Sequence, residues 1–158
     1  MILKNKYLLI LFLSVSFFSS AQSAVEKCTA YHYSGRVELR DNNKVLLIGS
    51  ASSVSFNFEG NSCVISLQSV DSFEHQNYVS LELDGEYIGR IRIEKGAIQN
   101  FPVFITHKNK KHRLTIYKAT EAANGTVLFL GTTAKLIKNT APKKKKIEFI
   151  GDSITCGF

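Results

Sequence analysis

The chain has 158 residues, of which 44% are hydrophobic and 21% are charged, and it contains ten glycines, two prolines and no tryptophan. This composition is typical of a folded globular protein and excludes an intrinsically disordered chain, a collagen and a coiled coil. Because domains usually contain roughly 100–200 residues, the length allows one complete domain. We expect a domain that starts near the C-terminus to be truncated.

Residues 1–21 have the pattern of a secretory signal peptide. Lys4 and Lys6 precede an apolar run over 7–18, and small residues follow up to Ala21. The alternative is a transmembrane anchor, but a spanning helix needs about 20 apolar residues, and two serines interrupt this shorter run. We predict cleavage after Ala21, a secreted or periplasmic location, and no stable membrane span in the mature chain.

The net charge of +7 could attract anionic partners. Removal of residues 1–21 takes away two lysines and no acidic residue. The remaining basic residues are spread along the chain, and no nucleic-acid recognition motif accompanies them. We therefore predict no nucleic-acid partner.

The three cysteines, Cys28, Cys63 and Cys156, match neither a disulfide framework nor the ligand spacing of a zinc site. We predict no metal and no cofactor. Cys63 alternates in phase with Ile65 and Leu67, which favours a buried apolar thiol. A Cys28–Cys63 disulfide is the alternative, since an exported protein folds in an oxidising compartment.

From residue 30 to 140, short runs of β-branched and aromatic residues alternate with turn signals, and no stretch has the apolar spacing of an amphipathic helix. The predicted strands are 34–40, 44–48, 52–58, 62–69, 77–83, 87–93, 101–106, 112–118, 126–131 and 133–138. The predicted turns are Asp41-Asn42-Asn43, Gly60-Asn61, Asp84-Gly85 and Asn124-Gly125.

Strict alternation places Val54, Phe56 and Phe58 on one face of their strand, with polar residues between them. About ten such strands joined by short turns suit two packed sheets better than one open sheet, whose edges would invite aggregation. The sequence therefore predicts an all-β, antiparallel β-sandwich of the jelly-roll type over residues 22–140.

Residues 141–146, Ala-Pro-Lys-Lys-Lys-Lys, differ in character from the strands before them. Four adjacent lysines repel one another, and the proline cannot donate a ladder hydrogen bond. We interpret the segment as a basic linker. A polybasic patch for membranes or polyanions is the alternative.

After the linker, an apolar strand over 147–150 runs directly into Gly151-Asp152-Ser153. In an α/β sheet, a serine at such a junction presents its hydroxyl at the carboxyl edge of the sheet. The glycine permits the tight exit, and the backbone N–H groups that follow could stabilise an oxyanion. An ordinary turn serine is the alternative for Ser153.

The C-terminal segment Gly-Asp-Ser-Ile-Thr-Cys-Gly-Phe over 151–158 resembles the first block of the SGNH, or GDSL-like, hydrolases in the form found in carbohydrate esterase family 2. Residues 111–121 followed by Gly131 and the linker resemble the end of that family's N-terminal jelly-roll domain. Gly35-Arg36 and the stretch 49–60 resemble its opening strands. The resemblance covers most of the mature chain, so it is far more specific than an isolated Gly-Asp-Ser.

This resemblance implies that Ser153 is the catalytic nucleophile and that its backbone N–H is one oxyanion donor. Family members take further donors from a later Gly and Asn and their general base from a His near the C-terminus, whereas this chain ends five residues after Ser153. Its four histidines all precede the nucleophile, which contradicts the family order; they are His32, His75, His107 and His112. We expect residues 147–158 to be the truncated start of an SGNH hydrolase domain, and the chain to be inactive alone.

Three functions follow from these observations. The first is that the parent protein is a carbohydrate O-acetyl esterase, similar to an acetylxylan esterase, acting on acetylated xylan or mannan. The second is a carbohydrate-binding module, whose stacking platforms would have to be tyrosines, which more often pack at the edge of a core. The candidates are Tyr31, Tyr33, Tyr78, Tyr87 and Tyr117. The third is a scaffold that packs on the catalytic domain. The oligomeric state is left open.

Overall fold

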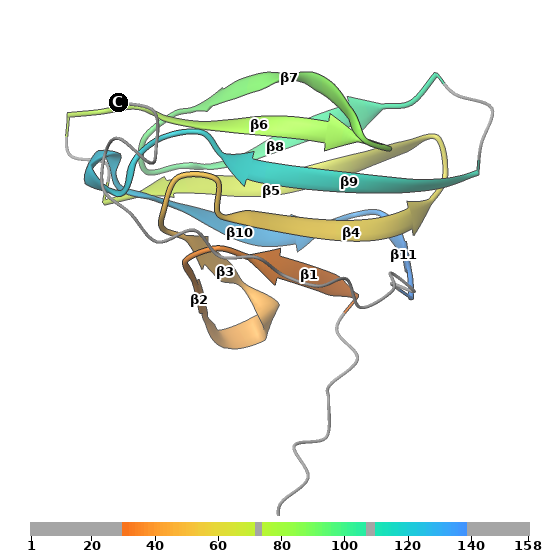
Figure 1. Cartoon of the computed structure of the whole chain (residues 1–158), viewed down its shortest axis with the longest axis horizontal. Coiled ribbons are helices and arrows are strands. Elements are labelled where there is room, and N and C mark those ends of the chain that lie inside the picture. The colour runs from red at the N-terminus through yellow and green to blue at the C-terminus, as the bar shows by residue number, and fades with distance from the viewer. Residues whose placement is uncertain (1–29, 72–73, 107–109, 139–158) are drawn as a thin grey trace, which may run out of the picture.

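The computed structural model describes residues 30–71, 74–106 and 110–138, which form eleven β-strands and two short 3-10 turns, η1 (Asp41–Asn43) and η2 (Ala122–Asn124) (Figure 1). The predicted signal peptide, Cys28, the linker, and the segment that carries Ser153 and Cys156 lie outside these residues. In the described ranges, no helix is long and apolar enough to cross a membrane.

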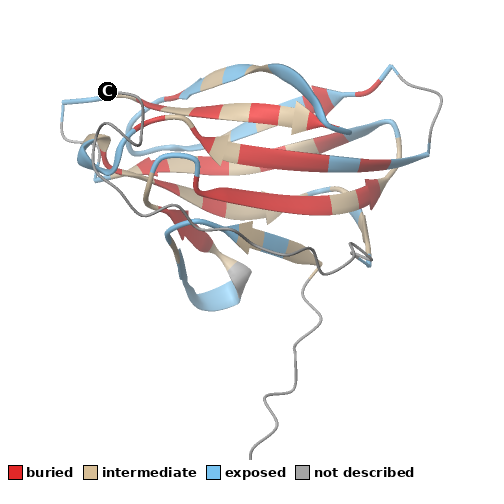
Figure 2. Cartoon of the chain, viewed as in Figure 1, coloured by how far each residue is buried: buried red, intermediate tan, exposed pale blue. Residues whose placement is uncertain are grey.

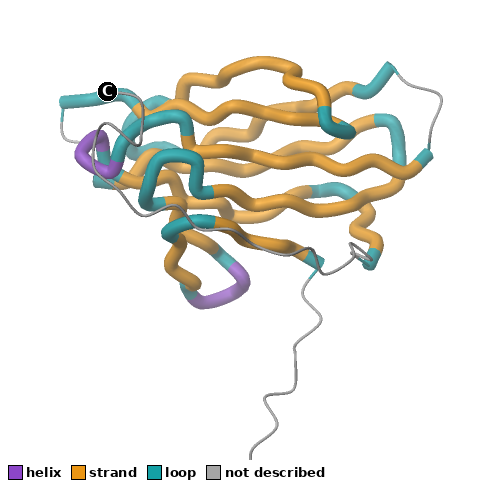
Figure 3. The backbone as a smooth tube through the Cα atoms, viewed as in Figure 1, coloured by secondary structure: helices purple, strands orange, loops and turns teal. Residues whose placement is uncertain are grey.

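The strands form two antiparallel sheets, as the ribbon and the tube both show (Figures 1 and 3). Sheet A has the order β1 (Tyr31–Ser34), β4 (Ser53–Glu59), β9 (Lys111–Lys118), β6 (Asn77–Leu83), β7 (Glu86–Ile93), and β11 (Lys135–Ile137) also pairs with β4. Sheet B has the order β2 (Val37–Leu39), β3 (Val45–Leu47), β10 (Thr126–Thr132), β5 (Ser62–Val70), β8 (Ile98–Phe104). The predicted all-β, two-sheet sandwich is confirmed.

The core lies between the two sheets and is built from alternate residues of each strand (Figure 2). Phe56 of sheet A and Phe129 of sheet B are completely buried. The Phe129 ring lies 6.3 Å from the Phe56 ring and 5.3 Å from the Tyr31 ring, so it joins the sheets at the centre of the molecule. Each such side chain contributes about 1.5–3 kcal/mol by leaving water.

The single strand predicted over 34–40 is wrong, because the chain changes sheet there. β1 pairs with β4 in sheet A, and β2 pairs with β3 in sheet B. Gly35 makes the change with a φ of +77°, and a Cβ at this position would lie 2.9 Å from the Cα of Ser52. Only glycine supplies both the left-handed backbone and the close approach.

The strand predicted over 101–106 is displaced, because β8 begins at Ile98 and ends at Phe104. Its register is set by β5, whose residues Ser62 to Gln68 pair with Phe104 to Ile98. β8 is an edge strand, which explains how it accommodates Pro102.

Two ends of the described chain meet along β4. Ile137, in β11, pairs with Asn57, and Tyr31, in β1, pairs with the adjacent Phe56. β11 and β1 therefore lie end to end on the same side of β4. The chain enters and leaves the sandwich at neighbouring points.

Candidate functional site

Ser153, the predicted nucleophile, lies outside the described residues, and so does His107. The other three histidines are in the sandwich: His32 and His75 are exposed, and His112 is buried. No described residue can therefore be placed next to Ser153, and its role stays a prediction.

His112 forms a pair with Asp84, with 2.7 Å between Nδ1 and Oδ2. The His112 side chain has no exposed surface and lies 5.7 Å from the Phe58 ring, within the core. The other carboxylate oxygen of Asp84 accepts a hydrogen bond from the Arg113 backbone N–H at 2.8 Å. The pair therefore connects the β6–β7 turn to β9, and we interpret it as structural.

The five candidate tyrosines divide between the two faces of sheet A. Tyr31 and Tyr33 pack against the core, and burial raises the pKa of both phenols, that of Tyr33 to about 12. Their cross-strand partners place the other three on the outer face; these are Tyr78, Tyr87 and Tyr117. The expectation of core-edge packing is confirmed for the first two alone.

The outer face of sheet A offers polar groups, but most of them contact one another. The Arg90 guanidinium lies 4.4 Å over the Tyr78 ring, and Tyr117 donates to Glu82 at 3.2 Å. Arg113 donates to Ser55 at 3.1 Å. Tyr87, at 68% exposure, is the one tyrosine of this face with a largely uncovered ring.

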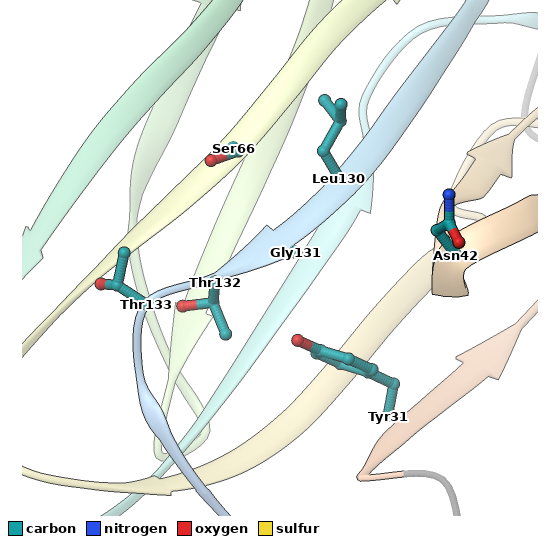
Figure 4. A pocket seen from close by; sticks show the side chains of 7 residues that line it. All are labelled: Tyr31, Asn42, Ser66, Leu130, Gly131, Thr132 and Thr133. Carbon is teal, nitrogen blue, oxygen red and sulfur yellow. The ribbon is translucent and has the colours of Figure 1, made fainter.

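A hollow of about 330 Å³ lies where β1, η1, β5 and β10 approach one another (Figure 4). A β-bulge in β10 opens it, since the register with β5 shifts between Phe129 and Gly131. Gly131 has a φ of +128°, and the Tyr31 hydroxyl lies 3.9 Å from where its Cβ would be. The lining is mainly hydroxyl and amide groups: Tyr31, Asn42, Ser66, Leu130, Gly131, Thr132 and Thr133.

Most hydroxyls around this hollow already have partners within the sandwich. Thr132 donates to the Val64 carbonyl at 2.8 Å, and Thr133 accepts from the Val64 N–H at 3.1 Å. Ser66 donates to Asn100 at 2.6 Å. A sugar would have to compete with these bonds. We therefore interpret the hydroxyls as stabilising the bulge and not as a ligand site.

A buried polar network fills one end of the sandwich and was not predicted. Lys118 is 1% exposed, and its Nζ donates to the carbonyls of Thr120 at 2.6 Å and Glu121 at 2.7 Å. Asn77, which is fully buried, donates to Ser69 and to the Asn124 carbonyl, both at 3.0 Å. These bonds hold the loop between β9 and β10. Alternation gave no signal for them, because both positions fall in phase with apolar residues.

Cys63 is 2% exposed, which confirms the predicted buried thiol. It is a free cysteine in the structure, and burial raises its pKa to about 11. The thiolate is therefore not available near neutral pH. Across the described ranges, no group of three or more His, Cys, Asp or Glu side chains could hold a metal ion.

The described residues define a class of protein: an antiparallel β-sandwich with a closed apolar core, whose polar groups are largely paired with one another. Residues 33–143 match the family model for the carbohydrate esterase 2 N-terminal domain. The chain belongs to this family.

A curated relative, the cellulase/esterase CelE of Acetivibrio thermocellus, is 31% identical over 129 residues, which are 80% of this chain and 15% of that protein. A family two carbohydrate esterase from Clostridium thermocellum, solved in complex with cellohexaose, is 30% identical with a TM-score of 0.67. The match covers 81% of this chain and 39% of that one. The chain thus spans well under half the length of these relatives.

The sandwich is also similar to a family 36 carbohydrate-binding module solved with calcium and xylotriose, with a TM-score of 0.51 and 14% identity. That match covers 64% of this chain and 89% of the module. At this identity the likeness concerns the fold alone.

Proposed function

We propose that this chain is the N-terminal part of a secreted enzyme that removes O-acetyl groups from polysaccharides of the xylan or mannan type. The observation that carries the proposal is the order of its parts. Residues 33–143 match the carbohydrate esterase 2 N-terminal family, and three more lysines, the apolar residues 147–150 and Gly151-Asp152-Ser153 follow in the sequence. The finding that relatives of this domain are esterases supports the same conclusion.

In this proposal, the Ser153 hydroxyl attacks the acetyl carbonyl after a general base takes its proton. The Ser153 backbone N–H donates to the oxyanion of the tetrahedral intermediate. Loss of the sugar alcohol leaves an acetyl-serine, and water then releases acetate and restores the hydroxyl. In this proposal the described part of the sandwich supplies no catalytic group, and its buried histidine, His112, is held by Asp84 of the β6–β7 turn.

The test is acetate release from acetylated xylan and acetylated mannan by the protein expressed through its complete hydrolase domain. We expect Ser153→Ala to abolish release. Ser34→Ala, which removes an exposed hydroxyl from β1 of sheet A, should leave it unchanged and serves as the matched control. Equal activity of Ser153→Ala and the parent protein would contradict the nucleophile assignment.

The chain 22–158 is the second arm of this experiment. With Ser153 but without the family's later Gly, Asn and His, it should not hydrolyse p-nitrophenyl acetate faster than its Ser153→Ala variant. Each absent oxyanion donor alone costs about 10²–10³ in rate. Turnover that depends on Ser153 in this short chain would mean that a histidine of the sandwich acts as the base.

Mature protein from the culture medium should begin at Gln22 if the export signal is cut as proposed.

A carbohydrate-binding role is the second candidate, and the observation that favours it is the exposed Tyr87 ring beside Glu82 on the outer face of sheet A. Affinity electrophoresis of the chain in gels that contain xylan or glucomannan tests this role. We expect Tyr87→Ala to remove any retardation. Retardation that survives this change would exclude the face around Tyr87.

A further inference from the structure

The two outer faces of the sandwich differ in charge. On sheet A, the outward positions carry many ionised side chains, among them Glu59, Glu82, Arg90, Arg92, Lys111 and Arg113. On β10, β5 and β8 of sheet B, the outward positions are the even-numbered residues 62–70, 98–104, 126 and 128. None of these residues is charged. We call this surface the uncharged face.

The uncharged face also exposes large apolar side chains at its edge. Ile98 and Phe104, both on the edge strand β8, are 56% and 76% exposed. Leu128 and Val64 lie half-buried further in. A solvated sheet face is normally polar, and an exposed edge strand is normally protected by charge or by proline, which β8 has at Pro102. β8 carries no charged residue at all.

Three polar side chains on the uncharged face already have hydrogen-bond partners in the sandwich. Ser66 donates to Asn100 at 2.6 Å, Gln68 donates to the Gly96 carbonyl at 2.7 Å, and Thr126 donates to the Val70 carbonyl at 3.4 Å. Such a surface can be covered by protein at little cost, because few donors lose water without a partner. A polysaccharide would need free donors and acceptors, so these bonds disfavour a glycan as the occupant.

The size and position of the face fit a neighbouring domain. Three strands of about seven residues make a surface about 14 Å by 23 Å, about 320 Å², which is one side of a small inter-domain interface of about 600 Å² in total. Ile137, near the end of the described chain, pairs with Asn57 of β4. The eight residues 139–146 can span at most about 29 Å. This exceeds the spacing of about 10 Å between packed sheets, so residue 147 can reach the outer side of sheet B.

We propose that the uncharged face is the docking surface for the hydrolase domain that begins at Ile147 of the same polypeptide. The inference rests on the proposed function, which supplies that domain, and on the relatives, of which the sandwich is 39% or less. Depletion of charge together with exposed apolar side chains is typical of the core of an interface. Sheet A, with its ionised outer side chains, remains in water.

Carbene footprinting tests the proposal on two forms of the protein. In the chain that ends at Phe158, Phe104, Ile98 and Tyr87 should be labelled in proportion to exposures of 76%, 56% and 68%. In the protein extended through the hydrolase domain, labelling of Phe104 and Ile98 should fall several-fold. Tyr87, which faces outward on sheet A, is the matched control and should be labelled equally in both forms.

Each other outcome overturns the docking proposal in a recognisable way. Equal labelling of Phe104 in both forms would show that the face is open. Shielding in the short chain that disappears on dilution would identify a second copy as the occupant, and shielding that appears only with acetylated xylan would identify a glycan. Acetate release that depends on Ser153 is measured on the same samples. If the extended protein releases acetate but Phe104 and Ile98 stay fully labelled, the docking proposal alone is rejected. If these two residues are shielded but no acetate is released, the proposed function alone is rejected.

A double variant, Ile98→Lys with Phe104→Lys, provides an independent test. Both side chains are exposed in the sandwich, so the fold should tolerate the change. In the extended protein, the added charges should restore labelling of Leu128 and Val64, whereas Tyr87→Lys should not. Continued shielding in the double variant would overturn the proposal.

Discussion

Lys118 is the residue whose environment departs furthest from what its type suggests. It is 1% exposed, and its ammonium group donates to two backbone carbonyls of the loop that follows β9. A lysine is almost never fully buried unless it is paired. Here the carbonyl oxygens of Thr120 and Glu121 take the place of a partner carboxylate.

Replacing this amine should destabilise the sandwich. Lys118→Met keeps the aliphatic stem but removes the two short hydrogen bonds to the carbonyls of Thr120 and Glu121. Each carbonyl keeps one longer bond, from the Ser50 hydroxyl at 3.4 Å and from the Asn124 N–H at 3.1 Å, so we expect a total loss of about 1–3 kcal/mol. Urea unfolding followed by circular dichroism measures the change. Lys95→Met, at an exposed position, is the control and should have no effect. Equal midpoints for the two variants would show that the buried bonds contribute nothing.

The same amine should give the stability a dependence on pH. Burial lowers the pKa of Lys118 to about 8 from its usual value of 10.5. Between these values the unfolded chain holds the proton and the folded chain does not, so the free energy of unfolding rises with pH. The difference in unfolding free energy between the parent chain and Lys118→Met should therefore increase from pH 7.5 to 9.5. A constant difference would contradict the lowered pKa.

For single residues, the sequence predicted burial correctly only where the residue type agrees with the alternation of the strand. Cys63 was placed correctly because Ile65 and Leu67 share its phase. Asn77 and Lys118 occupy equally regular inward positions, yet their residue types argue for exposure. Asn77 donates to Ser69 and to the Asn124 carbonyl, 8 and 47 residues away. Lys118 donates to backbone carbonyls only two and three residues further on, which residue type does not reveal.

Among the elements, the connection between β1 and β2 is the most demanding. Gly35 and Gly96 have nearly the same φ, +77° and +78°, but a Cβ at Gly96 would have no neighbour within 4 Å. At Gly35 it would lie 2.9 Å from the Cα of Ser52. An alanine at Gly96 would therefore introduce backbone strain alone, whereas an alanine at Gly35 would also collide with the Ser52 backbone.

We expect Gly96→Ala to cost about 1–2 kcal/mol, the strain of a left-handed alanine. Gly35→Ala should cost clearly more, because the Ser52 backbone must move as well. Thermal unfolding of the two variants compares them directly. Equal losses would show that β1 and β4 adjust without cost.

The strands themselves were largely predictable, because each has a regular apolar period and ends at a residue suited to a turn. Asp84 and Gly85, both with positive φ, close the β6–β7 hairpin as expected. The split at Gly35 was missed, since 34–40 has no other break in its pattern. Membership of one sheet or the other depends on pairing with β4 or β3, which is a long-range property.

The whole molecule is held together by aromatic packing across the two sheets. Phe129→Ala removes the fully buried ring that contacts Phe56 and Tyr31, and we expect a loss of about 3–5 kcal/mol. Phe104→Ala, the same change at 76% exposure, should have little effect on the chain that ends at Phe158. Denaturant unfolding checks both. A small loss for Phe129→Ala would mean that the two sheets are not one cooperative unit.

The two-sheet architecture followed from the sequence, but the contrast between its outer faces did not. Val64 and Leu128 fall at outward positions of predicted strands, and Ile98 lies outside the strand predicted over 101–106. Their shared face becomes visible only when the register aligns β10, β5 and β8. The catalytic assignment rests on the motif around Ser153, which the described residues neither support nor oppose.

Because β1 and β11 meet along β4, the two ends of the sandwich lie close together, which favours insertion of the domain into other proteins. Since Tyr31 and Ile137 pair with adjacent residues of one strand, joining them by a short peptide would close the sandwich into a ring with little distortion. A unit of this kind can be spliced into a host loop, duplicated in tandem or lost by deletion without rethreading its neighbours. We therefore expect circular permutants, in which the original ends are joined and the chain is opened at the Asp84-Gly85 hairpin, to fold.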